Sequence, residues 1–169
     1  MIKCKALRRN IMSEKDIKRI TSFTVNHNVL KPGFYISRID GDITTYDLRT
    51  RIPNAGDYMD NATMHSVEHM IATYIRNSDI SDDVIYFGPM GCQTGFYLVV
   101  RNQKPTVVLE YLKDVIKKTL SHEGGVFGAS AIECGNYRNL SLDAAKKELS
   151  VYLEVIKDLE EKDFVYKEQ

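Results

Sequence analysis

The chain has 169 residues, and its 23 Lys and Arg residues balance 23 Asp and Glu residues to a formal net charge of zero. This length suits one domain with a substantial core, and the balanced charge argues against a general nucleic-acid or membrane-surface binder. No apolar run approaches the ~20 residues of a membrane span, and no apolar core follows the basic start as in a secretory signal, so we expect a cytoplasmic protein.

Residues 1–12 are basic and show little periodicity, which predicts a loose N-terminal tail. Met12 is an alternative start, and the sequence does not decide whether residues 1–11 are translated. Ser13 and Asp16 resemble a weak helix cap, which predicts one or two helical turns up to residue 20. Residues 25–30 predict an extended segment or a turn.

The rest of the chain alternates between hairpin strands and separate helices, without a regular βαβ order. Asp40-Gly41-Asp42 lies between two strand-like stretches and predicts a tight hairpin turn. This pattern favours the α+β class, with an antiparallel sheet packed with α-helices. The predicted elements are strands at 34–39, 43–50, 84–87 and 96–100, and helices at 63–77, at 105 to about 123, and, capped by Ser141, at 142 to about 162.

The helix at 63–77 carries a polar stripe beside its wide apolar face. His65, Glu68, His69 and Arg76 lie on that stripe, whereas the rest of the circumference is apolar or small and uncharged. Such a helix is expected inside a domain, where these groups are costly without strong partners. A divalent metal ion held by His65 and His69 removes most of that cost, because residues four apart can point at one ion.

Spacing alone leaves the third ligand and the reaction open. His27, His122, Cys92 and Cys134 are candidates, as are several carboxylates. The chain has three cysteines, Cys4, Cys92 and Cys134, and no C-x-x-C pair. This set predicts thiols for chemistry or metal binding rather than a disulfide framework. H-x-x-E-H also occurs in inverted-zincin proteases, for which Glu148 is the candidate third ligand. A small binding protein with a closed metal site is a further alternative.

Longer strings resemble one known family. P-M-G-C-Q-T-G-F-Y at 89–97, H-S-V-E-H at 65–69 and E-C-G at 133–135 together resemble LuxS, the S-ribosylhomocysteine lyase family. S-F-T-V-N-H at 22–27 and Y-D-L-R at 46–49 agree as well. The resemblance runs from about residue 22 to residue 153. It assigns residues 1–20 to an N-terminal extension outside the match and residues 21–169 to a LuxS-like catalytic domain.

Carried over position by position, the resemblance implies one divalent metal per subunit, held by His65, His69 and Cys134, with water or a substrate oxygen in the fourth place. It implies iron(II) as the working metal, which zinc or cobalt can replace. Cys92 matches the acid–base thiol and Glu68 the acid–base carboxylate. The sequence does not say which of the two moves which proton.

The resemblance also implies substrate-binding residues. Arg49 matches the arginine beside the catalytic thiol and substrate, and Arg76 matches an arginine near the site. Ser22 and His27 match positions that reach the substrate from the partner subunit. Some members have an Asp-Ile-Ser triplet, whose Asp helps to hold the amino-acid end of the substrate, where this chain has Tyr86-Phe87-Gly88 and no acidic side chain.

The fold implied by the resemblance is an α+β homodimer with two identical active sites at the subunit interface. The reaction implied is cleavage of the thioether of S-ribosylhomocysteine by carbonyl migration and β-elimination. Its products are homocysteine and 4,5-dihydroxy-2,3-pentanedione, the autoinducer-2 precursor. The sequence does not separate a quorum-sensing role from recycling in the activated methyl cycle.

Overall fold

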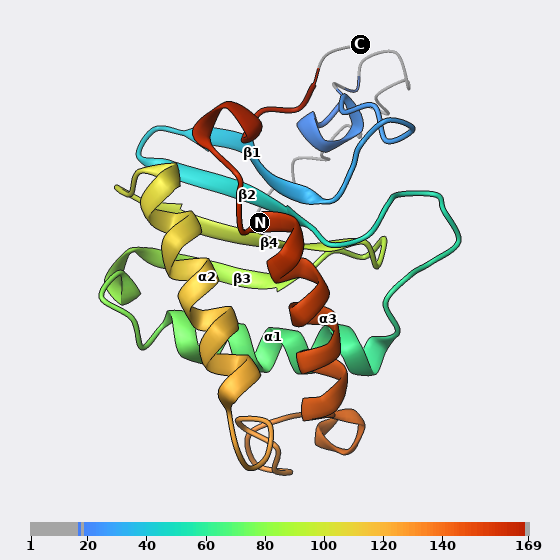
Figure 1. Cartoon of the computed structure of the whole chain (residues 1–169), viewed down its shortest axis with the longest axis vertical. Coiled ribbons are helices and arrows are strands. Elements are labelled where there is room, and N and C mark those ends of the chain that lie inside the picture. The colour runs from blue at the N-terminus through green and yellow to red at the C-terminus, as the bar shows by residue number, and fades with distance from the viewer. Residues whose placement is uncertain (1–16, 18, 168–169) are drawn as a thin grey trace, which may run out of the picture.

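The computed structural model describes residue 17 and residues 19–167, and within them it has a four-stranded antiparallel sheet covered on one face by three α-helices (Figure 1). The sheet order β1-β2-β4-β3 places β2 and β4 in the centre. The strands are β1 (Gly33–Asp40), β2 (Ile43–Arg49), β3 (Val84–Pro89) and β4 (Gly95–Arg101). The α+β prediction and all four predicted strands are confirmed.

The central strands alternate between the helix-covered face and the opposite face. Tyr46 and Leu48 of β2 are 0% and 2% exposed and belong to the hydrophobic core, so they face the helices. Asp47 and Arg49 therefore point to the opposite face, and each is nevertheless only 2% exposed. Segments outside the regular elements must cover this charged pair.

Helix α1 (Asn61–Ile75) begins two residues before the predicted start at residue 63. Asp60 is the N-cap, and its carboxylate accepts a hydrogen bond of 2.7 Å from the backbone N–H of Thr63. Its apolar face packs against β3, α2 and α3, and the buried members of that face include Val67, Met70 and Ile71. The helix is thus an internal element, as its composition predicts.

Helix α2 (Pro105–Ser121) ends just before Gly124-Gly125, as predicted. Helix α3 (Leu142–Ile156) is shorter than predicted, since the chain leaves it at Lys157 and forms a separate 3-10 turn at Glu161–Asp163. This break lets Phe164 turn back into the core, where it is 1% exposed and stacks edge-on against Phe34 at 5.1 Å. A helix continued to residue 162 would carry Phe164 away from that contact.

The N-terminal segment and the C-terminal segment meet over the β1 side of the sheet (Figure 1). Residues 24–26, 29–33 and 165–167, with Leu159 and Asp163, line a common cavity of about 980 Å³ together with Tyr35, Ile36 and Ile39 of β1. Residues 25–30 form turns, one of the two predicted alternatives. The tail predicted at 1–12 and most of the helical turns predicted at 13–20 lie outside the described residues.

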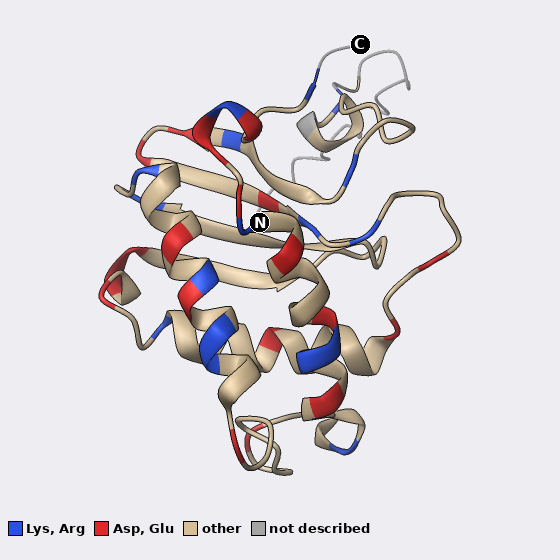
Figure 2. Cartoon of the chain, viewed as in Figure 1, with Lys and Arg blue, Asp and Glu red and all other residues tan. Residues whose placement is uncertain are grey.

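Charges of both signs alternate along α2 and α3 (Figure 2). No helix in the described part of the chain is long and apolar enough to span a membrane. The mixed surface agrees with the net charge of zero.

One ion pair fastens the loop between β2 and α1 to the helical layer. The Arg51 guanidinium donates from Nε at 3.1 Å, and also from Nη2, to the two carboxylate oxygens of Glu148 on α3. The Glu148 side chain is 6% exposed and that of Arg51 26%. Asp57 also contacts Arg51 at 2.5 Å, but its side chain is 73% exposed. The buried carboxylate is therefore the partner that matters for stability.

We expect Arg51→Met to lower the free energy of unfolding by about 2–4 kcal/mol, because it leaves the Glu148 carboxylate buried without its cation. Urea unfolding measures this change. The matched control Asp57→Ala should cost no more than about 0.5 kcal/mol. The double variant Arg51→Met/Glu148→Met should recover most of the loss, and a single-variant loss as small as that of the control would contradict this account.

Candidate metal centre and thiol site

Three side chains converge from α1 and from the loop between α2 and α3. His65 and His69 lie one helical turn apart on α1, and Cys134 belongs to the loop. Their ligand atoms all lie within 4.8 Å of one another, and all three residues are half-buried. The Cys134 Sγ atom is 3.3 Å from His65 Nε2. The structure thus brings together the three predicted metal ligands.

The outer nitrogen of each imidazole has a fixed partner. His65 Nδ1 lies 2.7 Å from the Asn139 side-chain oxygen, and His69 Nδ1 lies 2.7 Å from the Phe127 carbonyl oxygen. Because carbonyl oxygens only accept, each Nδ1 carries the hydrogen and each Nε2 keeps its lone pair for an ion. Asn139 and Phe127 were not predicted as site residues, because Asn139 ends the short 3-10 turn Tyr137–Asn139 and Phe127 lies in a loop, and neither segment has a periodic pattern.

Gly128 lets the loop approach His69 closely. It has a φ of +67°, and a Cβ atom there would meet His69 Nδ1 at 3.3 Å. The carbonyl of the preceding residue, Phe127, is the one that holds this imidazole. A glycine is therefore suited to this position both by its backbone conformation and by the available space.

The donor set fits a divalent transition metal. Ordinary metal–nitrogen and metal–sulfur bond lengths in a tetrahedral site put neighbouring ligand atoms about 3.5 Å apart, close to the 3.3 Å between Cys134 Sγ and His65 Nε2. Two imidazoles and one thiolate suit zinc, iron(II) or cobalt. Among the described residues, no fourth His, Cys, Asp or Glu joins the group. Three protein ligands and an open position are typical of catalytic sites and argue against a closed structural site.

Glu148 does not belong to this centre. Its carboxylate is bound by Arg51, as described above, and the group that could hold a metal comprises His65, His69 and Cys134. An inverted-zincin site with Glu148 as third ligand is therefore excluded. Glu68 is half-buried on the turn of α1 between the two histidines.

A second cluster of polar side chains surrounds the thiol of Cys92 in the turn between β3 and β4. Arg49 Nη1 is 3.7 Å from Cys92 Sγ and 2.5 Å from Thr94 Oγ1. Thr94 Oγ1 is itself 3.1 Å from Cys92 Sγ. On the other side of the guanidinium, the Asp47 carboxylate accepts hydrogen bonds of 3.1 Å from Nε and 2.6 Å from Nη2.

These contacts favour the thiolate form of Cys92. Burial by itself raises the pKa of the thiol, but hydrogen bonds from Thr94 and the positive charge of Arg49 outweigh it, so that the pKa lies below its ordinary value. Cys92 is exposed and hence accessible to a reactant. A low pKa and an accessible sulfur are the properties of a thiol that moves protons near neutral pH.

Ser22 and His27 lie with this thiol cluster. Both line a small pocket whose other walls include Asp47, Arg49 and Tyr97 of the same chain. Arg76, by contrast, is exposed at the C-terminal end of α1, where its guanidinium donates to the backbone carbonyls of Val84 and Ile85 at 3.1 and 3.2 Å. The structure therefore gathers three of the four predicted substrate-binding residues and leaves Arg76 apart.

The triplet at 86–88 presents an aromatic ring in place of an acid. Tyr86 and Gly88 lie on one face of β3, and a Cβ atom at Gly88 would be 2.0 Å from the Tyr86 hydroxyl oxygen. The ring thus occupies the space over Gly88, beside Tyr97, the partner of Gly88 on β4. Glycine at 88 is what allows the tyrosine at 86 to fold along the strand.

The metal group and the thiol cluster lie apart within one chain. No hydrogen bond or ion pair joins them among the residues that the structure describes. In Figure 1 the β3–β4 turn is at the right-hand end of the sheet, whereas the α2–α3 loop is at the bottom, beyond the helices. The metal group and the thiol cluster are therefore two separate groups of side chains within the described part of the chain.

Comparison with known proteins matches the chain to one family. The model of the family described as S-Ribosylhomocysteinase (LuxS) matches residues 20–163. A protein of Finegoldia magna named S-ribosylhomocysteine lyase is 41% identical over 157 residues, which cover 90% of this chain and 100% of the relative. Proteins of the same name from Clostridium beijerinckii and Borrelia garinii subsp. bavariensis are 42% and 38% identical, each over 89% of this chain and 99% of the relative.

We expect Asn139→Ala to weaken metal binding by about 10- to 100-fold, because His65 loses the acceptor that orients its ring. Competition with a chromogenic chelator measures the affinity. Asn139→Asp keeps an acceptor oxygen and should retain most of it. The exposed Asn77→Ala is the control. Equal affinities in Asn139→Ala and the control would show that Asn139 does not orient the ligand.

Proposed function

Because the chain belongs to the S-ribosylhomocysteinase (LuxS) family, whose curated relatives are named S-ribosylhomocysteine lyase, it is a carbon–sulfur lyase, and we propose that it cleaves its substrate by metal-assisted proton transfer. The observation that carries the proposal is the presence in one chain of both a His/His/Cys group and an activated thiol. The substrate is S-ribosylhomocysteine, and the products are homocysteine and 4,5-dihydroxy-2,3-pentanedione, the autoinducer-2 precursor.

His65, His69 and Cys134 would hold one divalent metal per subunit, iron(II) in the cell, with zinc or cobalt able to replace it. When bound, such an ion withdraws electrons from the sugar oxygens and makes the neighbouring C–H bonds more acidic. Asn139 and the Phe127 carbonyl orient the imidazoles for it.

The chemistry requires groups that move protons between neighbouring carbons. A thioether does not leave from an unactivated carbon, so the sugar carbonyl first migrates by two aldose–ketose shifts. The proton on the second carbon from the sulfur, next to the migrated carbonyl, is then acidic enough for β-elimination, which expels the homocysteine thiolate. Cys92, as thiolate, and Glu68 divide these transfers as bases and acids. Arg49 keeps Cys92 charged and contributes to substrate binding.

Substrate binding also involves Ser22 and His27, a role supported by their place in one pocket with Arg49. A substrate contact of Arg76 remains a prediction that its hydrogen bonds to β3 do not favour.

The active site forms between two subunits. Within one chain the metal group and the thiol cluster lie on different parts of the fold, although the reaction needs both around one substrate. In a two-fold homodimer, the metal group of each subunit meets the thiol cluster of the other, so two identical sites result. The metal half with Glu68 comes from one subunit, and the thiol half with Cys92 comes from the other. We further propose that this enzyme acts in the cytoplasm.

We expect purified protein to release homocysteine thiol from S-ribosylhomocysteine, as followed with a chromogenic thiol reagent. Cys92→Ala and Glu68→Gln should each lower the rate by about 100-fold or more with the metal still bound, because each removes a proton-transfer group. Cys134→Ala should lose the metal, whereas Glu148→Ala should keep it. Unchanged turnover in both Cys92→Ala and Glu68→Gln would refute these roles.

A complementation experiment tests the shared site. Cys92→Ala and Glu68→Gln subunits, each inactive alone, are mixed, unfolded and refolded together. Random pairing then makes roughly half of the dimers heterodimers. In each heterodimer one of the two sites has both Cys92 and Glu68, so the mixture should show roughly a quarter of the wild-type rate. A mixture as inactive as its components would place both groups of a site in one chain.

A further inference from the structure

Tyr166 reaches the thiol cluster from beyond the part of the chain that the family model covers, which ends at residue 163. Its hydroxyl donates to Asp47 Oδ2 at 2.9 Å across 119 residues of sequence. Its ring stacks on Tyr35 of β1, with centroids 5.0 Å apart and an angle of 23° between the planes. The same side chain lines the pocket that holds Ser22, His27 and Arg49. Neither the sequence motifs nor the family match assigns it a role.

Asp47, Arg49 and Thr94 connect Tyr166 to Cys92 through hydrogen bonds, and the donor and acceptor of each bond can be assigned. A guanidinium only donates, so Asp47 accepts from Arg49, and the Tyr166 hydroxyl must donate to the same carboxylate. On the other side, Arg49 Nη1 donates to Thr94 Oγ1. The Thr94 hydroxyl hydrogen is therefore free to point at Cys92 Sγ, which accepts it best as a thiolate.

Burial makes each link of this chain matter. Asp47 and Arg49 are 2% exposed although the three α-helices of the described chain cover the opposite face of the sheet, so protein groups rather than water must satisfy their hydrogen bonds. Burial, and then the negative charge of Asp47, raise the pKa of Tyr166 far above its ordinary value. The hydroxyl thus stays protonated and remains a donor wherever the enzyme works.

We propose that Tyr166 is a positioning residue of the thiol site, whose hydroxyl fixes Asp47 and thereby holds Arg49 against Thr94 and Cys92. Without this donor the Asp47 carboxylate is less neutralised and Arg49 is less firmly held, and both effects disfavour negative charge on Cys92. The inference rests on the proposed function only in taking Cys92 as a proton-transfer group.

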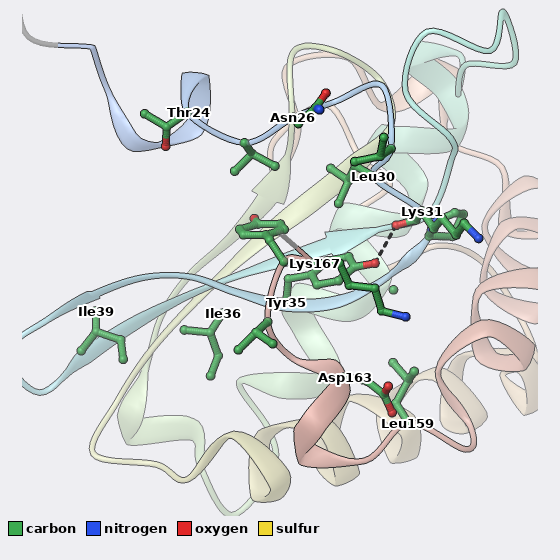
Figure 3. Close-up of a pocket in the computed structure, with 16 residues that line it drawn as sticks. Thr24, Asn26, Leu30, Lys31, Tyr35, Ile36, Ile39, Leu159, Asp163 and Lys167 are labelled. Carbon is green, nitrogen blue, oxygen red and sulfur yellow. Dashed lines mark hydrogen bonds between the residues drawn. The ribbon is translucent and has the colours of Figure 1, made fainter. Parts of the chain in front are cut away.

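Other titratable groups face the same cluster. Tyr97 projects from β4 and Tyr35 from β1, and His27 comes from the N-terminal segment. His27 Nδ1 lies 2.9 Å from the Val25 carbonyl oxygen. The Tyr35 hydroxyl donates to the Lys31 carbonyl, and Figure 3 shows this hydrogen bond as a dashed line. Tyr97 and His27 line the small pocket with Arg49, and Tyr35 lines the larger cavity beside it, whereas the Tyr166 hydroxyl donates a hydrogen bond to Asp47.

A packing role for Tyr166 would need only its ring. The cavity of about 980 Å³ beside it is lined by the N-terminal segment, β1 and the C-terminal segment, and Figure 3 shows Asp163 and Lys167 on the last of these. Tyr166→Phe keeps the ring and its stacking on Tyr35 and removes the hydroxyl alone. The substitution therefore separates positioning from packing.

The test is the pH dependence of Cys92 alkylation by iodoacetamide in the metal-loaded protein, followed by peptide mass spectrometry from about pH 5 to pH 9. Tyr166→Phe should move the midpoint upward by about 0.5 to 1 pH unit. Alkylation well below the midpoint should therefore slow by about 3- to 10-fold. Thr94→Val, which removes the hydroxyl beside the sulfur, should move it in the same direction, and Thr94→Ser should leave it near wild type.

Tyr111→Phe is the matched control, because Tyr111 also donates to an aspartate, Asp79 at 3.2 Å, on another part of the fold. The midpoint pH of Cys92 alkylation in Tyr111→Phe should equal that of the wild type. Deleting residues 166–169 is a second variant that must shift the midpoint at least as far as Tyr166→Phe. A Tyr166→Phe midpoint equal to that of Tyr111→Phe would overturn the proposal. Alkylation needs no substrate, so failure of the lyase assay would refute the function without touching this result.

Discussion

The buried ion pair between Asp47 and Arg49 is the constraint on which one half of the site depends. Both residues alternate with core residues along β2, so they face away from the helices, yet almost none of their surface is exposed. Buried charges are stable only when every donor and acceptor is satisfied. Thr94 and Tyr166 supply the remaining hydrogen bonds, and the thiol of Cys92 lies at the end of this arrangement. The stability of the pair and the acidity of the thiol therefore have a common cause.

The metal half obeys a different constraint. An α-helix places His65 and His69 on one stripe by its own geometry, but their rings can still rotate. The loop between α2 and α3 fixes them, since it supplies an acceptor for each outer nitrogen and brings in Cys134. Secondary structure thus sets the spacing of two ligands, and irregular chain sets their direction and adds the third.

The α-helices of the described chain cover only one face of the sheet, and this arrangement determines where the metal group and the thiol cluster lie. Helices occupy one face of the sheet, and the thiol cluster lies on the other, under the N- and C-terminal segments. The metal group is formed by α1 and the α2–α3 loop, on the helical side of the sheet, so the two groups lie on different sides of the fold. In the proposed homodimer, the two-fold axis would bring the metal group of one subunit to the thiol cluster of the other without any change of fold.

The sequence by itself determined the features that rest on local geometry. The Asp-Gly hairpin, the strands, the start of α2 at Pro105 and the shared stripe of His65 and His69 all follow from turn chemistry and periodicity. The family resemblance added Cys134 and Cys92, which spacing alone could not select. Only the tertiary structure decided that α3 ends at Ile156, that Asn139 and Phe127 orient the imidazoles, and that Tyr166 reaches Asp47. These contacts join residues 58 to 119 positions apart, or depend on where Phe164 must be buried, and no periodic pattern records them.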